Sequence, residues 1–183
     1  MTTSVPGYKT LTRELIVEVT EFAQSVIEQF AQDVVSTEES PRGGGALAFL
    51  IPGEYQYGKV LGDVTDKKGL EHSGHAVNKN NIMEKHGVII SELVADPEAD
   101  PPICGGGIQL SDGSYLSFSG FPPEWGQSFC IMLAERFDLV TPQRVNSIIE
   151  QSSDPLKARV YLGTARFFLL HYMFGAALGE AAG

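Results

Sequence analysis

The chain has 183 residues, 43% of them hydrophobic and 20% charged, which is typical of one globular domain. Its 13 basic and 23 acidic residues give a formal net charge of −10. This charge opposes binding to nucleic acid or anionic lipid, because both require clusters of Lys and Arg. No Cys-x-x-Cys pair is present, and the sequence does not begin with a basic and then apolar secretory signal. We therefore expect a soluble, cytoplasmic protein with free thiols.

The first predicted element is a long amphipathic helix over residues 15–34. Apolar residues recur there at spacings of three and four, which places them on one helical face. Thr10 or Thr12 can cap its start, because a threonine oxygen accepts a hydrogen bond from a free backbone N–H of the first turn. Residues 37–45 contain one proline and three glycines and end the helix.

A β-hairpin is predicted next. Residues 46–51 form a short apolar run, and the Pro-Gly pair at residues 52–53 is a turn signal. Residues 55–64 then alternate loosely between apolar and polar side chains, with the best strand pattern over residues 57–64. We expect these two strands to pair with each other in an antiparallel sheet.

The stretch over residues 66–81 is polar and is predicted to be a solvated loop that carries histidines. In this interpretation residues 78–85 form a short helix with two apolar side chains facing inward. Residues 88–94 are an apolar run that is either a buried strand or the end of that helix. Periodicity cannot separate the two in so short a segment.

A second hairpin is predicted by strands over residues 108–110 and 115–119. The turn between them contains Asp112 and Gly113, and an Asp-Gly pair between apolar alternating segments is a strong hairpin signal. We expect both hairpins to pair in one antiparallel sheet that packs against the first helix.

Three helices are predicted after the second hairpin. The first covers residues 124–137, and the others begin after Thr141 and Asp154, which are capping side chains followed by proline. The apolar run over residues 167–178 is too short for a membrane span, which needs about 20 residues. Hairpins flanked by helices favour an α+β fold with an antiparallel sheet.

The segment around the second hairpin resembles the GlcG/HbpS family. It shares a glycine-rich strand, an Asp-Gly turn, a Ser-Gly strand end, a proline-containing step and an Ala-bearing helix, here at residues 105–110, 112–113, 119–120, 122–124 and 124–137. Residues 45–49 and 11–30 are similar to that family's first strand and first helix. The resemblance implies a profilin-like α-β-α sandwich over residues 1–140. Residues 141–183 are then an extra C-terminal helical segment, packed on that domain or on a partner subunit.

The resemblance also implies function. Some domains of that family bind haem, the cobalamin-pathway relatives through a histidine, and the domains tend to form oligomers. The chain departs from the family in two places. The polar residues 66–81 differ from the compact helix expected there, and residues 125–127 read Trp-Gly-Gln where the family usually carries an acidic residue.

Glu71, His72 and His75 form a concentrated group of ligand side chains. With His86 they offer three imidazoles, which suit zinc, iron and haem iron. A solvated loop with histidines is the simpler interpretation, and no separate metal site is predicted. The resemblance points to haem or a related tetrapyrrole, held near this segment and the entry to the glycine-rich strand. The candidate cofactor-binding residues are His72, His75, Gly105, Gly106 and Gly107.

Cys104 precedes those glycines, and backbone N–H groups in such a loop are able to stabilise an oxyanion. No histidine base sits at a recognisable spacing, so the favoured role of Cys104 is a small apolar residue entering a strand. The glycine stretches lack the Gly-Lys-Ser/Thr ending of a phosphate-binding loop. Nucleotide binding is therefore not expected.

The favoured function is non-catalytic binding of a small molecule by a homo-oligomeric protein. The alternatives are a protein–protein interaction module that acts through the C-terminal helix, and a cysteine- or metal-dependent enzyme. The final helix carries neighbouring large apolar residues that point in different directions, so one core-facing stripe cannot hold them all. We expect a homo-oligomer joined partly through this helix. A monomer would have to wedge it between its sheet and another helix.

Overall fold

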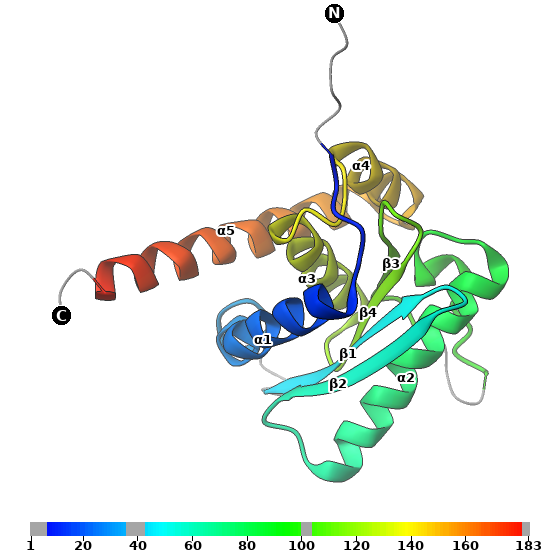
Figure 1. The fold of residues 1–183 in the computed structure, drawn as a ribbon, viewed down its shortest axis with the longest axis horizontal. Helices are drawn as coiled ribbons and strands as arrows, with labels where there is room; N and C mark the ends of the chain where they lie inside the picture. The colour runs from blue at the N-terminus through cyan, green and yellow to red at the C-terminus, as the bar shows by residue number, and fades with distance from the viewer. Residues whose placement is uncertain (1–6, 36–42, 100–103, 181–183) are drawn as a thin grey trace, which may run out of the picture.

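The computed structural model describes residues 7–35, 43–99 and 104–180. In them, one antiparallel sheet has its four strands in the order β2-β1-β4-β3 (Figure 1). Ala48 of β1 faces Gly58 of β2 on one side and Ser117 of β4 on the other. Both predicted hairpins and their pairing in one antiparallel sheet are confirmed. The strands are β1 (Gly44–Ile51), β2 (Tyr55–Gly62), β3 (Gly107–Gln109) and β4 (Tyr115–Ser119).

The first helix and the last three helices of the described residues begin close to their predicted starts. Thr12 caps the first helix, with its Oγ accepting a hydrogen bond from the Leu15 N–H at 3.2 Å, and Thr141 caps the fourth in the same way. A π-helical segment, Ala31–Val35, continues the first helix. The helices are α1 (Arg13–Phe30), α2 (Asp66–His86), α3 (Pro123–Arg136), α4 (Pro142–Gln151) and α5 (Pro155–Glu180).

Helices cover both faces of the sheet (Figure 1). Leu47 and Phe49 of β1 point into the main core, which α1 and α3 share. The alternate residues Ala46 and Ala48 point the other way, against Ala76 of α2. Because side chains alternate across a strand, β1 is buried on both sides. This is an α+β fold in which the four-stranded antiparallel sheet packs against helices.

The predicted loop over residues 66–81 is wrong, because this segment is most of the 21-residue helix α2. The helix lies close to the sheet through small residues. A Cβ added to Gly58 would lie 3.2 Å from Ser73 Oγ, and one added to Gly69 would lie 3.2 Å from the Val60 side chain. A helix that packs through Gly, Ala and Ser shows no large apolar residues at helical spacing. Its sequence therefore lacks the usual signal of a buried helix.

The apolar run over residues 88–94 is neither a full strand nor the end of α2. Gly87 adopts φ 64° and ends α2 in a left-handed cap. Ile90 then forms an isolated antiparallel bridge with Ile108, and residues Ser91–Val94 form a short 3-10 helix, η2. This short connection ties α2 to the edge strand β3.

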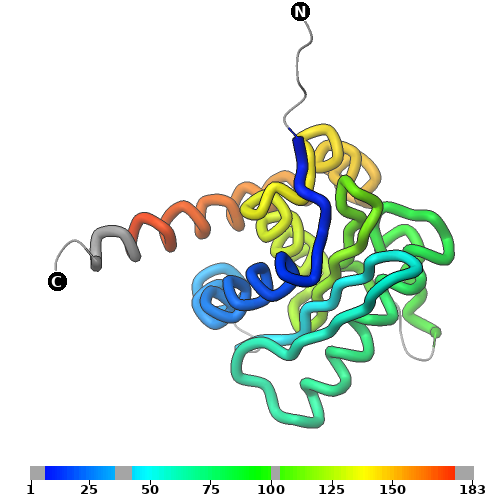
Figure 2. The backbone as a smooth tube through the Cα atoms, viewed as in Figure 1, coloured from blue at the N-terminus to red at the C-terminus, as the bar shows by residue number. Residues whose placement is uncertain are grey.

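The C-terminal helices belong to the same core as the sheet. Ile148 of α4 and Phe168 of α5 lie in one buried cluster with Phe129 of α3, and the ring centroid of Phe168 is 5.1 Å from that of Phe30 in α1. Beyond this contact α5 runs outward from the rest of the fold (Figures 1 and 2). Across the described segments, no helix combines the length and apolarity that a membrane crossing requires.

Candidate functional site

A pocket of about 380 Å³ lies beside α2, the loop that enters β3 and the connection from β4 to α3. We call it the histidine pocket. It brings together residues as distant in sequence as His72 and Pro123, because β4 and the β3 entry lie side by side next to α2. Its lining residues are His72, His75, Lys79, Cys104, Gly105, Ser119, Gly120, Phe121, Pro122 and Pro123.

Helix α2 supplies three basic side chains to the histidine pocket. His72, His75 and Lys79 are spaced by three and four residues and therefore share one helical face. The Nδ1 atom of His72 lies 3.5 Å from the hydroxyl oxygen of Ser119 at the end of β4. The two histidines were predicted as site residues. Lys79 was not, although its spacing from His75 in a helix would have pointed to it.

Lys79 is only 5% exposed, which is rare for a lysine. Its ammonium group donates a hydrogen bond to the Phe118 carbonyl oxygen at 2.7 Å. No carboxylate of the described segments forms an ion pair with it. Burial disfavours the charged form and lowers the pKa of Lys79 from 10.5 to about 8. The pocket therefore contains a buried cation that a fixed acidic side chain does not neutralise.

The three predicted glycines have different surroundings. Gly105 lines the histidine pocket directly. Gly106 has φ +102°, and a Cβ there would lie 3.3 Å from Lys79 Nζ and 3.0 Å from the Phe118 oxygen. The missing side chain of Gly106 thus leaves room for the lysine. Gly107 packs behind the pocket, where its N–H donates to Ser91 Oγ at 2.9 Å.

Cys104 is exposed and lines the same pocket as His72 and His75. Cys104 was predicted to be a small apolar residue entering a strand, and it does lie three residues before β3, but its side chain is exposed. The sequence could not show its nearness to the histidines, because 29 positions separate Cys104 from His75. The second cysteine, Cys130, is buried in α3, and burial raises the pKa of its thiol. Both thiols are free, as predicted.

The three-histidine interpretation is not supported by the positions on α2. His86 ends that helix, 11 residues beyond His75, which is about 16 Å at 1.5 Å per residue. In residues 7–35, 43–99 and 104–180, no three His, Cys, Asp or Glu side chains form a group that could hold a metal ion. The fourth histidine, His171, is exposed on α5, with its ring centroid 4.7 Å from that of Phe167.

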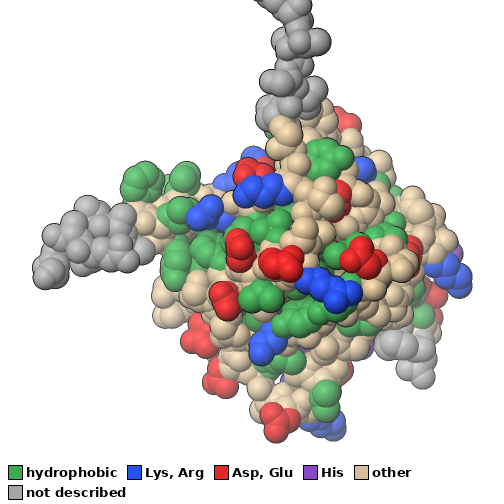
Figure 3. Space-filling model, in the orientation of Figure 1, with side chains coloured by type: hydrophobic (Ala, Val, Ile, Leu, Met, Phe, Trp, Pro, Cys, Tyr) green, Lys and Arg blue, Asp and Glu red, His purple; other side chains and the backbone are tan. Residues whose placement is uncertain are grey.

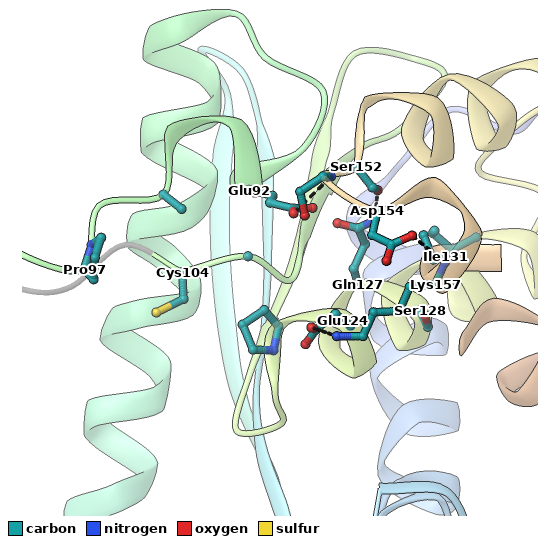
Figure 4. A pocket seen from close by; sticks show the side chains of 15 residues that line it. Glu92, Pro97, Cys104, Glu124, Gln127, Ser128, Ile131, Ser152, Asp154 and Lys157 are labelled. Atoms are coloured by element: carbon teal, nitrogen blue, oxygen red, sulfur yellow. Dashed lines mark hydrogen bonds and ion pairs between the residues drawn. The ribbon is translucent and has the colours of Figure 1, made fainter. Parts of the chain in front are cut away.

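A second, larger cavity of about 470 Å³ lies between η2, α3 and the start of α5 (Figure 4). We call it the junction cavity. It shares Cys104, Gly105 and Pro123 with the histidine pocket. The view shows Glu124 and Lys157 pointing toward each other, and their ion pair measures 2.6 Å.

The acidic groups of the junction cavity already have partners within the chain. Glu92 accepts a hydrogen bond from the Ser153 N–H at 3.1 Å, and Asp154 accepts one from the Lys157 N–H at 3.0 Å. Asp154 thus caps α5, and the Glu92–Ser153 hydrogen bond and the Glu124–Lys157 ion pair fasten the start of the helix to the body. The cavity therefore has a structural explanation, whereas the described part of the chain supplies no acidic partner that would explain the buried charge of Lys79. On this ground the smaller histidine pocket is the stronger candidate site.

The chain matches no protein-family model, no curated protein and no solved structure. The class of the protein therefore follows from its own fold alone. It is an α+β protein with a four-stranded antiparallel sheet packed against helices and with further helices at the C-terminus. Its candidate site is a basic pocket at the end of the sheet, beside α2.

Proposed function

We propose that this protein is a non-catalytic binding domain for a small molecule with at least one carboxylate, which enters the histidine pocket. The candidate ligand is haem or a related tetrapyrrole. We further propose that the scaffold is a profilin-like α-β-α sandwich of the GlcG/HbpS type and that the protein assembles as a homo-oligomer. The observation that carries the proposal is the buried ammonium group of Lys79, which has no carboxylate partner among the described residues and lies on the same helical face as His72 and His75.

The charge at Lys79 supports an anionic ligand. A buried charge without a partner costs free energy, so buried lysines are normally paired or functional. A ligand carboxylate at this position would supply the missing counter-ion. The two imidazoles beside it add hydrogen-bond donors and, when protonated, further positive charge. The whole chain has a net charge of −10, so the surfaces outside the pocket repel the same anionic ligand.

The donor set of the histidine pocket suits a tetrapyrrole. His72 and His75 offer imidazole, which is an ordinary axial ligand of haem iron. Lys79 is placed to pair with a propionate, and Pro122 and Pro123 add apolar surface for the ring. The pocket volume lies within the roughly 300–1,000 Å³ that small-molecule sites occupy. When bound, haem would supply a redox-active iron to the site.

Titration with haem and with protoporphyrin IX tests this function. Protoporphyrin keeps both propionates but has no iron, so it separates the role of Lys79 from that of the histidines. We expect a Soret shift with haem that the His72→Ala/His75→Ala variant loses. We expect Lys79→Met to weaken both ligands by about tenfold, which corresponds to roughly 1.4 kcal/mol of binding free energy.

His86→Ala is the matched control, because it removes a histidine of the same helix that lies outside the pocket. It should bind haem as the wild-type chain does. A double variant at His72 and His75 with an unchanged haem spectrum would remove both residues from the site. Equal affinities of Lys79→Met and the wild-type chain for protoporphyrin would contradict the anion-binding role of the lysine.

A further inference from the structure

Helix α5 carries two apolar stripes on opposite faces. The inner stripe includes Leu162, Ala165 and Phe168, which are buried in the core. The other stripe faces solvent, and its large side chains are 57–74% exposed. We call it the outer stripe. Its positions are Leu156, Val160, Gly163, Phe167, Leu170 and Phe174.

The spacing of the outer stripe indicates which kind of element can pack against it. Its positions follow one another at intervals of four, three, four, three and four residues. These intervals follow the 3.6-residue turn of an α-helix, so the six positions lie in one narrow line along α5. A line this narrow and this long can be covered along its whole length by another helix. The outer stripe therefore fits a second helix that lies along α5.

We propose that the outer stripe is covered by a second copy of this chain, with the two α5 helices packed antiparallel. This inference rests on the homo-oligomer of the proposed function but not on its ligand. It assigns the interface residues, the direction of the pair and the register.

The stripe is complementary to itself in one antiparallel register. Phe167 of one copy then lies opposite Gly163 of the other, Val160 opposite Leu170, and Leu156 opposite Phe174. A Cβ placed on Gly163 has no other atom within 4 Å, so this position is open to a large ring from the partner. Each large residue thus meets a smaller or similar one across the seam. In a parallel pair Phe167 would face Phe167 and Gly163 would face Gly163, which crowds one layer and leaves the other empty.

The charges beside the stripe favour a protein partner over a membrane surface. Lys157 and Arg166 flank it, but each already pairs with a glutamate of its own chain, Glu124 and Glu135 respectively. Two copies can therefore approach without strong repulsion between these cations. Arg159 is an exposed cation beside the stripe that forms no ion pair among the described residues, and this one charge is opposed by the net charge of −10, which repels an anionic bilayer.

The position of α5 leaves the stripe accessible. The helix extends beyond the body of the fold, and hydrophobic side chains are visible on the surface of this arm (Figure 3). Each partner contributes about 800 Å² to a standard interface, which is more than five side chains in one line supply. In an antiparallel pair the projecting part of each α5 lies along the start of the other, and flanking residues add the remaining area.

The mass of the full-length chain in solution at tens of micromolar tests the interface. We expect a dimer for the wild-type chain and a folded monomer, with an unchanged far-UV circular dichroism spectrum, for Phe167→Glu/Leu170→Glu. Val17→Glu is the control, because it puts the same charge on another exposed apolar residue, on α1, and it should remain a dimer. A monomeric wild-type chain, or a double variant that stays dimeric, would overturn the proposal.

A size swap tests the register. Gly163→Phe alone should dissociate the dimer, because its ring would clash with the partner's Phe167. Gly163→Phe/Phe167→Gly should restore the dimer, since the same two positions again pair large with small. If the double variant stays monomeric but folded, the register is wrong.

Spin labels at Gly175→Cys, in a Cys104→Ser background, report the direction of the helices. Gly175 is exposed and lies beside the stripe. In the antiparallel register the labels are separated by about 30 Å along the helix axes, whereas a parallel pair separates them by about 10 Å, the distance between packed helices. A short distance would reject the antiparallel pair while leaving the homo-oligomer intact. Haem binding is measured independently of all these variants, so failure of the ligand proposal is recognised separately.

Discussion

Lys79 shows how one residue links the stability of the fold to the candidate site. Its side chain crosses from α2 toward the backbone of β4, where the Phe118 oxygen accepts one of its three N–H bonds. Burial removes most of the water that would solvate the charge. The ammonium group is therefore kept in an environment that favours the neutral amine, and a ligand carboxylate would reverse that preference.

The depressed pKa of Lys79 predicts a pH dependence of stability. The folded chain releases the proton near pH 8, whereas the unfolded chain keeps it up to about 10.5. Between these values the unfolded state binds more protons, so the free energy of unfolding rises with pH. The full rise is roughly 3 kcal/mol, from 1.36 kcal/mol per pKa unit. We expect urea denaturation of the wild-type chain to show this gain from pH 7.5 to 10.5 relative to Lys79→Met.

A matched control for this measurement is Lys85→Met, which removes an exposed lysine of the same helix. Its stability should follow that of the wild-type chain across the same pH range. Parallel curves for the wild-type chain and Lys79→Met would show that the amine of Lys79 is solvated, in contradiction to its buried position.

Gly106 and Gly113 provide a second test at this scale. Both have positive φ, +102° and +93°, so alanine is strained at either position. Gly113 has nothing within 4 Å of an added Cβ, whereas Gly106 would meet the Phe118 oxygen at 3.0 Å and Lys79 Nζ at 3.3 Å. We expect Gly106→Ala to destabilise the chain by about 1–3 kcal/mol, more than Gly113→Ala, and to weaken ligand binding as well. Equal decreases in melting temperature for Gly106→Ala and Gly113→Ala would mean that Lys79 moves aside at no cost.

At the scale of elements, α2 lies against the sheet through small side chains. Ala46, Ala48 and Ala76 are fully buried between helix and sheet, and Gly58 faces Ser73. The close approach brings the His72–His75 face of α2 to the end of β4. Large residues in this layer would lift the helix and separate the two sides of the histidine pocket.

Substitutions on opposite faces of α2 test this packing. Ala76→Leu overfills the layer and should lower stability by about 1–3 kcal/mol. Gly74 lies on the same helix with nothing within 4 Å of an added Cβ, so Gly74→Ala should instead stabilise by roughly 0.5–1 kcal/mol through helix propensity. Both values follow from chemical denaturation. An unchanged free energy of unfolding for Ala76→Leu would indicate that α2 shifts outward at little cost. The haem affinity of this variant would then show whether the pocket depends on the position of the helix.

The sequence predicted those elements whose formation depends on local signals. The Asp-Gly turn and the capping threonines specify their hairpin and helix starts within a few residues, so β3, β4, α1 and α4 could be predicted. Helix α2 could not, because Lys79 and Asn80 are polar yet buried, and its apolar spacing is weak. The meeting of His72, His75 and Gly105 in one pocket was proposed from a resemblance. The spacing of Lys79 from His75 points to the pocket only once residues 66–86 are known to be a helix, and this helix forms through tertiary packing that its own sequence pattern does not show.

At the scale of the whole molecule, the division at residue 140 predicts that the N-terminal part can fold without the C-terminal helices. The core argues for the opposite expectation. Leu162 and Phe168 of α5 are almost fully buried against the body, and Tyr172 donates a hydrogen bond to the Ser25 carbonyl oxygen at 3.1 Å. The inner stripe of α5 therefore completes the hydrophobic core on the α1 and α3 side.

Truncation of the chain decides between these expectations. A chain that ends at Asp154 loses α5 and exposes the surface beneath Leu162 and Phe168. Burial of each such side chain contributes about 1.5–3 kcal/mol, and their sum is a large part of the roughly 5–15 kcal/mol that stabilises a typical domain. We expect this chain to unfold or aggregate at 25 °C. A chain that ends at Met173 keeps the inner stripe, and its circular dichroism spectrum and melting curve should stay close to those of the full chain. A cooperative melt of the shorter chain at the full-length temperature would establish that residues 1–154 fold without α5 and leave α5 only its role at the dimer interface.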